Sequence, residues 1–214
     1  RYSPLTRVTP RNVGRLKKAW TYHIGMIDAP EQSSPTFEGT PIVAGGRMFV
    51  GGSFTKVTNN GGGSVNQKFL TAFDLKTGEW ISSCTPTLDG RVWDMEQSSD
   101  GKLIIAGDFT QVNGDPVASG LAKINPSNCQ VDTSFRVRIS KNGGRGMVRA
   151  IDLLGDRLFI GGQFNGVEMN GGPVKPAPNT YEVNAITGLV GGWRPQTNGT
   201  VFDIDASDRG DRVY

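Results

Sequence analysis

Three acidic residues stand at matching places at the ends of short apolar segments: Glu96, Asp152 and Asp205. Carboxylate oxygens are the ligands that Ca²⁺ prefers in proteins. If the three segments lie side by side around a channel, the sequence predicts a ring of carboxylates that binds a cation such as Ca²⁺. An earlier comparable segment has Ile42 near this place, which weakens a symmetric ring.

A second interpretation assigns the same carboxylates to ion pairs. A basic residue opens the next predicted strand after each of them, at Lys102, Arg157 and Arg212. Charged pairs across neighbouring strands are common and contribute modest energy. We favour this interpretation, in which the acidic residues belong to the scaffold, and keep the metal site as the alternative.

Other catalytic chemistries have few residues to use. His23 is the only histidine, so any nucleophile–histidine system must use it, and a zinc cluster lacks ligands. Because His23 falls in an apolar stretch beside Trp20 and Tyr22, we interpret it as a partly buried, hydrogen-bonded side chain. No phosphate-binding glycine loop leads into a helix. The sequence therefore predicts no catalytic residue and no required cofactor.

A repeat decides how these residues can be positioned. Residues 47–54 return at 102–109 and 157–164, and a fourth copy opens at 212–214, so the period is 55 residues. A fixed period of this length is typical of an array of one supersecondary unit. The apolar triplet in each copy predicts a strand covered on both faces. The glycines after it predict a bulge or a close approach of two backbones.

Two further pieces complete each unit. A short apolar strand precedes the segment that recurs every 55 residues, and a hairpin with Asp or Asn at its turn follows that segment. Four short strands per unit, without helical periodicity, predict an all-β fold, a β-propeller of four-stranded blades. A β-solenoid and a sandwich are the alternatives, but a solenoid coil is usually shorter and a sandwich need not repeat.

This interpretation divides the chain into an arm and a series of blades. The predicted boundaries are an N-terminal arm at 1–35 with an outer strand at 17–25, blades at 36–86, 90–137 and 146–195, and a partial blade at 199–214. The incomplete last blade predicts either a fragment of a larger propeller or completion by partner chains. Self-assembly through open blade edges is therefore one hypothesis, since unpaired strand edges accept a further strand.

The charge of the chain is uneven. The formal net charge is +3, yet six basic residues precede the first acidic one, Asp28, and the rest is slightly acidic. A basic arm could meet nucleic acid. We interpret it as a solvated segment instead, because aromatic residues do not interleave with the charges as they do in single-strand binders. No apolar run reaches the roughly 20 residues of a membrane helix.

The two cysteines, Cys84 and Cys129, are predicted to remain apart. The blade alignment puts them at opposite ends of neighbouring outer strands, beyond the roughly 7 Å between Cα atoms that a disulfide tolerates. A bridge between them is the alternative, and it would indicate an oxidising compartment.

Three loops of different length separate the strands of successive units, at 58–67, 113–119 and 168–179. Loops on a rigid scaffold are where binding usually occurs. The sequence therefore predicts a module that binds a protein or a glycan through these loops.

Two resemblances emerge from these segments. Residues 47–214, with a Gly-Gly-x-Phe anchor and an Asp-x-x-Thr-Gly hairpin, resemble the delta-60-type repeat propellers of secreted bacterial proteins. Residues 1–50 resemble the start of PQQ-dependent quinoprotein alcohol and glucose dehydrogenases, in the segments 1–6, 9–16, 19–23 and 40–43.

The resemblances imply a location and an alternative function. The repeats imply an extracellular, cell-surface or periplasmic protein. The quinoprotein segment implies a partial dehydrogenase that oxidises alcohols or sugars with PQQ and Ca²⁺. Quinoprotein alcohol dehydrogenases typically carry adjacent cysteines against the cofactor, whereas Cys84 and Cys129 are far apart. We therefore carry over the fold and predict a non-catalytic, secreted or surface module for binding or structural assembly.

Overall fold

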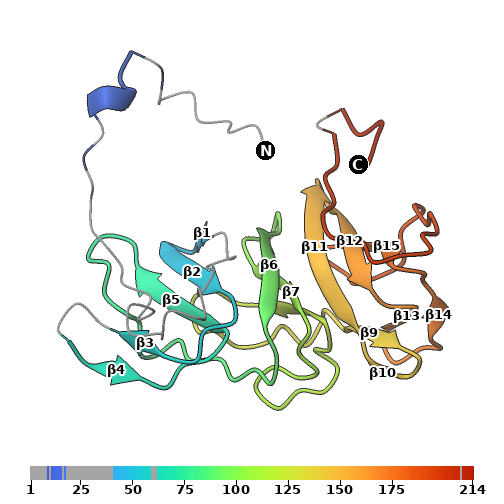
Figure 1. The fold of residues 1–214 in the computed structure, drawn as a ribbon, viewed down its shortest axis with the longest axis horizontal. Helices are drawn as coiled ribbons and strands as arrows, with labels where there is room; N and C mark the ends of the chain where they lie inside the picture. The colour runs from blue at the N-terminus through green and yellow to red at the C-terminus, as the bar shows by residue number, and fades with distance from the viewer. Residues whose placement is uncertain (1–8, 10, 16, 18–40, 59–61, 208) are drawn as a thin grey trace, which may run out of the picture.

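The fold is built from small antiparallel sheets that stand next to one another (Figure 1). The computed structural model describes residues 9, 11–15, 17, 41–58, 62–207 and 209–214. The predicted outer strand at 17–25, apart from Lys17, and His23 lie outside these residues. The described N-terminal part contains one short 3₁₀ helix, η1 (Val13–Arg15).

Three sheets share one plan, in which the second strand is central. The first sheet contains β1 (Ile42–Ala44), β2 (Arg47–Gly51) and β5 (Leu70–Asp74); the second β6 (Val92–Gln97), β7 (Leu103–Gly107) and β8 (Leu121–Ile124); the third β11 (Met147–Leu154), β12 (Arg157–Gln163) and β15 (Thr180–Asn184). All neighbouring strands are antiparallel. The predicted β-propeller class is thereby confirmed.

The fourth strand of each blade is present only as a single bridge. The three bridges are Phe73 with Trp80, Ile124 with Val131, and Val183 with Val190. The bridge between Ala206 and Val213 is of another kind, because it matches the pairing of the first two strands, such as that of Leu153 with Leu158.

The hairpin before each of these bridges is closed by a side chain. The Asp74 carboxylate accepts hydrogen bonds from the backbone N–H groups of Lys76 (2.8 Å) and Thr77 (2.9 Å), and Asn184 does the same in the third sheet. Gly78 and Gly188 then take φ values of 72° and 68°, which favour glycine. Cys129 takes the same left-handed conformation, with φ 60°, in the second sheet.

Glycines of the second strands let side chains of the next unit approach closely. A methyl group on Gly51 would lie 2.6 Å from Val92, and one on Gly161 would lie 2.7 Å from Val201. The expected bulges are present, but they lie on the partner strands β6 and β11. Gly107 and Gly162 lie opposite these bulges, where the backbone oxygens of Arg91 and Met147 leave no room for a side chain. This is the predicted close approach of two backbones.

Two small sheets were not predicted. One pairs β3 (Val57–Thr58) with β4 (Ser64–Val65); the other has the order β10 (Gly144–Arg145), β9 (Val137–Lys141), β13 (Gly166–Met169) and β14 (Lys175–Pro176). In the second of these, β9 leaves the second blade and pairs with β13 of the third. This pairing joins the two blades through their backbones.

The apolar core lies between consecutive sheets. Phe49 and Leu70 of the first sheet share one buried cluster with Leu103 and Ile105 of the second. A second cluster joins the second and third sheets, and there Ile104 of β7 packs among residues of β11 and β12. The first strands also approach one another, because β6 contacts both β1 and β11. This arrangement is typical of propeller blades, whose first strands are innermost.

Candidate functional site

The three carboxylates of the predicted ring lie in successive units of the repeat. Glu96 and Asp152 occupy matching places on β6 and β11, and Asp205 lies in the last hairpin. The Asp152 carboxylate accepts a hydrogen bond of 2.7 Å from the backbone N–H of Ala206. Among the described residues, no three His, Cys, Asp or Glu side chains form a group that could hold a metal ion. The Ca²⁺ ring therefore stays a prediction from the sequence.

The basic residues that open the second strands form ion pairs with other acids than we predicted. Lys102 Nζ lies 2.6 Å from Asp132, and Arg157 Nε lies 2.9 Å from Glu182. The strand register explains the difference, because Ile104 and Phe159 are the residues directly opposite Glu96 and Asp152. Arg157 reaches Glu182 on the third strand of its blade, β15, and Lys102 reaches Asp132, next to the bridged residue Val131 of the fourth strand.

Hydrogen bonds set the charge of these acids. Burial alone would raise the pKa of Asp132, but hydrogen bonds from Lys102 and Ser134 lower it to about 2. The hydrogen bonds from Arg157 lower the pKa of Glu182 against the opposing effect of burial. Both carboxylates are therefore held in their charged form.

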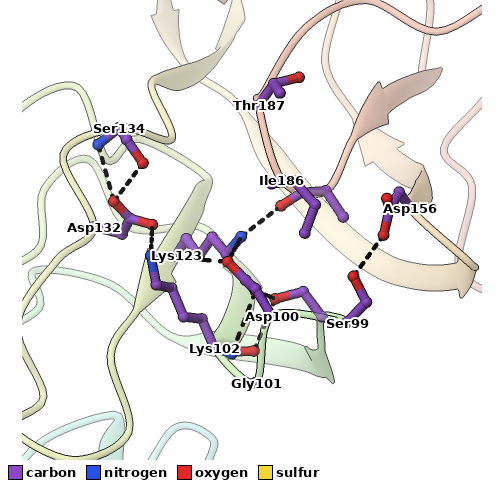
Figure 2. Close-up of polar contacts among 12 residues, drawn as sticks. Ser99, Asp100, Gly101, Lys102, Lys123, Asp132, Ser134, Asp156, Ile186 and Thr187 are labelled. Carbon is purple, nitrogen blue, oxygen red and sulfur yellow. Dashed lines mark hydrogen bonds and ion pairs between the residues drawn. The ribbon is translucent and has the colours of Figure 1, made fainter.

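A buried lysine joins the second and third blades (Figure 2). Lys123, on β8, is fully buried, and its Nζ donates to Asp100 (2.8 Å) and to the carbonyl oxygen of Ala185 (2.9 Å). Nearby, the Ser99 hydroxyl donates to Asp156 at 2.6 Å. Asp100 and Ser99 belong to the second blade, and Ala185 and Asp156 to the third. Because a buried cation is stable only when it is paired, this network fixes the two blades together.

The cysteines form a disulfide, which corrects the expectation that they remain apart. Cys84 and Cys129 are bonded, with 5.2 Å between their Cα atoms. The outer rims of the first two blades approach more closely than the strand alignment indicated. Asn113 contributes to this approach, because it accepts a hydrogen bond from Thr87 N–H and donates one to the Cys129 carbonyl oxygen.

The sequence did not identify one group of side chains on the innermost strands. Trp93 and Arg149 are the extra residues of the bulges in β6 and β11, since the register of each strand shifts there. The guanidinium carbon of Arg149 lies 4.8 Å from the centre of the Trp93 ring and 5.1 Å from that of Phe202. Phe202 holds the matching place in the last hairpin. The alternation of aromatic and basic residues at these three places was the available signal.

The two arginines beside Trp93 differ in their partners. Arg91 lies 4.7 Å from the Trp93 ring centre and donates two hydrogen bonds to Asp108, at 3.0 and 2.6 Å. Within the described residues, the buried Nε of Arg149 and the buried Nε1 of Trp93 have no hydrogen-bond partner. Arg91 is therefore paired with an acid, whereas Arg149 and Trp93 each retain a donor without an acceptor among these residues.

The predicted binding loops share one topological position. Each joins the second and third strands of its blade, between β2 and β5, β7 and β8, or β12 and β15. Matching connections in successive blades emerge at the same face of an array. Two of these loops carry exposed apolar side chains, Val65 (37% exposed) and Val174 (56% exposed).

Comparisons with known proteins agree with both resemblances. Residues 1–62 match a family model named PQQ, which is described as the glucose/ethanol/alcohol dehydrogenase β-propeller domain. Residues 98–135 match a β-propeller domain of unknown function, DUF5122. Each model covers less than half of the chain.

Two curated relatives come from Gluconobacter oxydans. The dehydrogenase subunit of its alcohol dehydrogenase (quinone) is 30% identical over 94 residues, which are 44% of this chain and 10% of that protein. The large subunit of its glycerol dehydrogenase is 41% identical over 51 residues, 23% of this chain and 7% of that protein. The chain thus spans a small part of the length of these relatives. The described residues form no helix that is long and apolar enough to cross a membrane.

Proposed function

We propose that this chain is a non-catalytic β-propeller module, secreted or held at the cell surface, that binds a protein or glycan through three loops. The observation that carries the proposal is the common position of residues 58–67, 113–119 and 168–179 between the second and third strands of fixed blades. Exposed apolar side chains in two of these loops support a binding role.

The fixed blades supply what binding requires. The disulfide joins the first and second blades, and the Lys123 network joins the second and third. A rigid scaffold lowers the entropic cost of ordering the loops when a ligand binds. The mechanism is thus the presentation of preformed loops, without a chemical step.

The disulfide also supports a location outside the cytoplasm. Such bonds persist in oxidising compartments and are rare in the cytosol. Cys84 and Cys129 are both buried and bonded, so this bridge belongs to the folded scaffold. An extracellular, cell-surface or periplasmic location fits this chemistry.

A partial quinoprotein dehydrogenase is the second candidate, favoured by the match of residues 1–62. The described residues do not fit its cofactors. Among them, no group of acidic side chains is assembled for Ca²⁺, and Cys84 is bonded to a cysteine 45 residues away instead of to an adjacent one. We therefore derive no oxidation step for this chain.

One pair of experiments separates the two candidates. Purified chain is incubated with PQQ and Ca²⁺, and dye reduction is measured with ethanol, glycerol and glucose. We expect no reduction above that of the cofactors alone; substrate-dependent reduction would exclude the non-catalytic proposal. On a glycan and peptide array, we expect binding that the double variant Val65→Asp, Val174→Asp removes. As the control, Leu75→Asp and Leu189→Asp, which lie on the hairpin turns, should leave binding unchanged.

A further inference from the structure

We propose that Trp93 and Arg149 form a second binding site, which takes the carboxylate group of a small organic ligand. The site lies on the innermost strands and not on the loops, so it stands whether or not the loops bind a partner. Four observations carry it: the two bulges, the contact between blades, the unpartnered donors and the lack of an ion pair of Arg149 among the described residues.

The two bulges determine the direction of both side chains. A β-bulge adds one residue to a strand and re-aims its side chain, and bulges are frequent next to functional sites. Trp93 and Arg149 are the added residues at matching positions of consecutive first strands, β6 and β11. The bulges bring the two side chains into contact across the boundary between blades, with 4.8 Å from guanidinium carbon to ring centre.

The donors at this place are not satisfied by the described protein. The Nε1 of Trp93 and the Nε of Arg149 are both buried without a hydrogen-bond acceptor. A buried donor without an acceptor destabilises the fold, and a charged donor does so more strongly. Two such donors in contacting side chains indicate an acceptor from outside the described residues, and we assign it to a ligand.

The charges around the site favour an anion. Arg91 is neutralised by Asp108, with which it forms an ion pair of 2.6 Å. Arg149 has no ion pair within the described chain, so its positive charge is not compensated there. The neighbouring Asp94 carboxylate accepts backbone N–H groups of Met95 and Ile151, each at 2.8 Å. These contacts hold Asp94 to the backbone that carries the bulges.

The ligand class follows from the shape of the donors. The planar guanidinium matches a carboxylate, which accepts hydrogen bonds and donates none. The rings of Trp93 and Phe202 lie about Arg149, and Phe202 is largely exposed. A flat, apolar group attached to the carboxylate can therefore contact an aromatic face. An aromatic carboxylate combines both properties.

The test follows the indole N–H of Trp93 during addition of sodium benzoate at constant ionic strength. Two-dimensional ¹H–¹⁵N NMR resolves the indole signals, and the variant Trp93→Phe identifies the one from Trp93. We expect a saturable shift of this signal. Methyl benzoate, which has the same ring without the charge, should produce none.

Two arginine variants locate the charge. Arg149→Gln is expected to weaken benzoate binding by about tenfold or more, because a charged hydrogen bond is lost. Arg138→Gln removes a half-exposed arginine, which lies 3.8 Å from Glu168, and should leave the affinity unchanged. The backbone spectrum checks that each variant is folded. If Arg149→Gln does not fold, Arg149→Lys keeps the charge but not the planar fork and should bind several times more weakly than the parent.

Three results would overturn the proposal. The first is the absence of a saturable Trp93 shift with benzoate. The second is equal affinity in the parent and in the folded Arg149 variant. The third is an equal response to inorganic phosphate, which would show that any anion suffices. None of them concerns the loops, so failure here leaves the array and dye-reduction experiments to decide the proposed function separately.

Discussion

Two polar side chains of this molecule join one blade to the next. Lys123 does so through a fully buried ammonium, and Asp152 through a carboxylate that accepts a backbone N–H of the next hairpin. Polar groups in such positions stabilise a fold only while every partner is present. Loss of one partner should therefore cost more than the modest value of a surface ion pair.

Protonation of Asp132 should destabilise the protein in acid. The pKa of Asp132 is about 2 in the folded chain, below the ordinary value of 3.8, so its contribution to stability is fully present above pH 3.8. It is lost as pH falls toward 2, and the shift corresponds to at most about 2 kcal/mol. The unfolding free energy of Asp132→Asn, from urea denaturation, should thus depend less on pH in this range than that of the parent.

The matched control is Glu79→Gln, whose exposed side chain lies on the hairpin after β5. Its unfolding curve should follow that of the parent at each pH. An equal pH dependence in Asp132→Asn and the parent would contradict the role assigned to the Lys102–Asp132 pair.

At the level of strands, the glycines of the anchor segment set the distance between sheets. Gly161 lies at a point where an added methyl group would be 2.7 Å from Val201 of the last hairpin. Such a contact cannot be relieved without movement of one sheet, since the interior is densely packed. The size of this residue, and not its backbone freedom, is what the fold requires.

The substitution Gly161→Ala should therefore destabilise the chain by about 1–3 kcal/mol, the usual cost of overpacking. Gly192→Ala is the control, because a methyl group there meets nothing within 4 Å. Thermal unfolding followed by circular dichroism should show a lower midpoint for the first variant alone. A Gly161→Ala protein as stable as the parent would show that the sheets can separate without cost.

The strands could be predicted from the sequence better than the contacts between blades. The segment that recurs every 55 residues predicted β2, β7 and β12, and the turns with Asp or Asn predicted the hairpins that follow. Both signals depend on local chemistry. The small sheet with β9 and β13 was missed, since its strands belong to different blades and their pairing is not local. The prediction that Cys84 and Cys129 stay apart was wrong for the same reason, because the distance between the outer edges of two blades depends on how the sheets pack.

The candidate site shows the same limit. The alignment of repeats brought Glu96, Asp152 and Asp205 to attention because they are acidic at matching places. It passed over Trp93 and Arg149, whose interest comes from the bulges and from contact across a blade boundary. A bulge shifts register by one residue, and the sequence alone did not reveal which residue is added.

For the whole molecule, the disulfide should contribute substantially to stability. It closes a segment of 45 residues between two blades, and removal of a native bridge in this length range typically costs about 2–4 kcal/mol. The double variant Cys84→Ala, Cys129→Ala should unfold at lower urea concentration than the parent. A reducing agent should lower the midpoint of the parent and leave that of the variant unchanged; equal midpoints without reductant would show that the bridge is dispensable.

At two of the three boundaries between successive units a glycine and a valine meet: Gly51 receives Val92, and Gly161 receives Val201. The second sheet has Ala106 at this place, and Ala106 shares a buried cluster with Val148 of the next sheet. A unit with a glycine on its second strand can therefore accept any neighbour that presents valine at the start of its first strand. Gene duplication could lengthen such a chain by whole blades without new solutions at each joint, and recombination could exchange blades while the loops diverge.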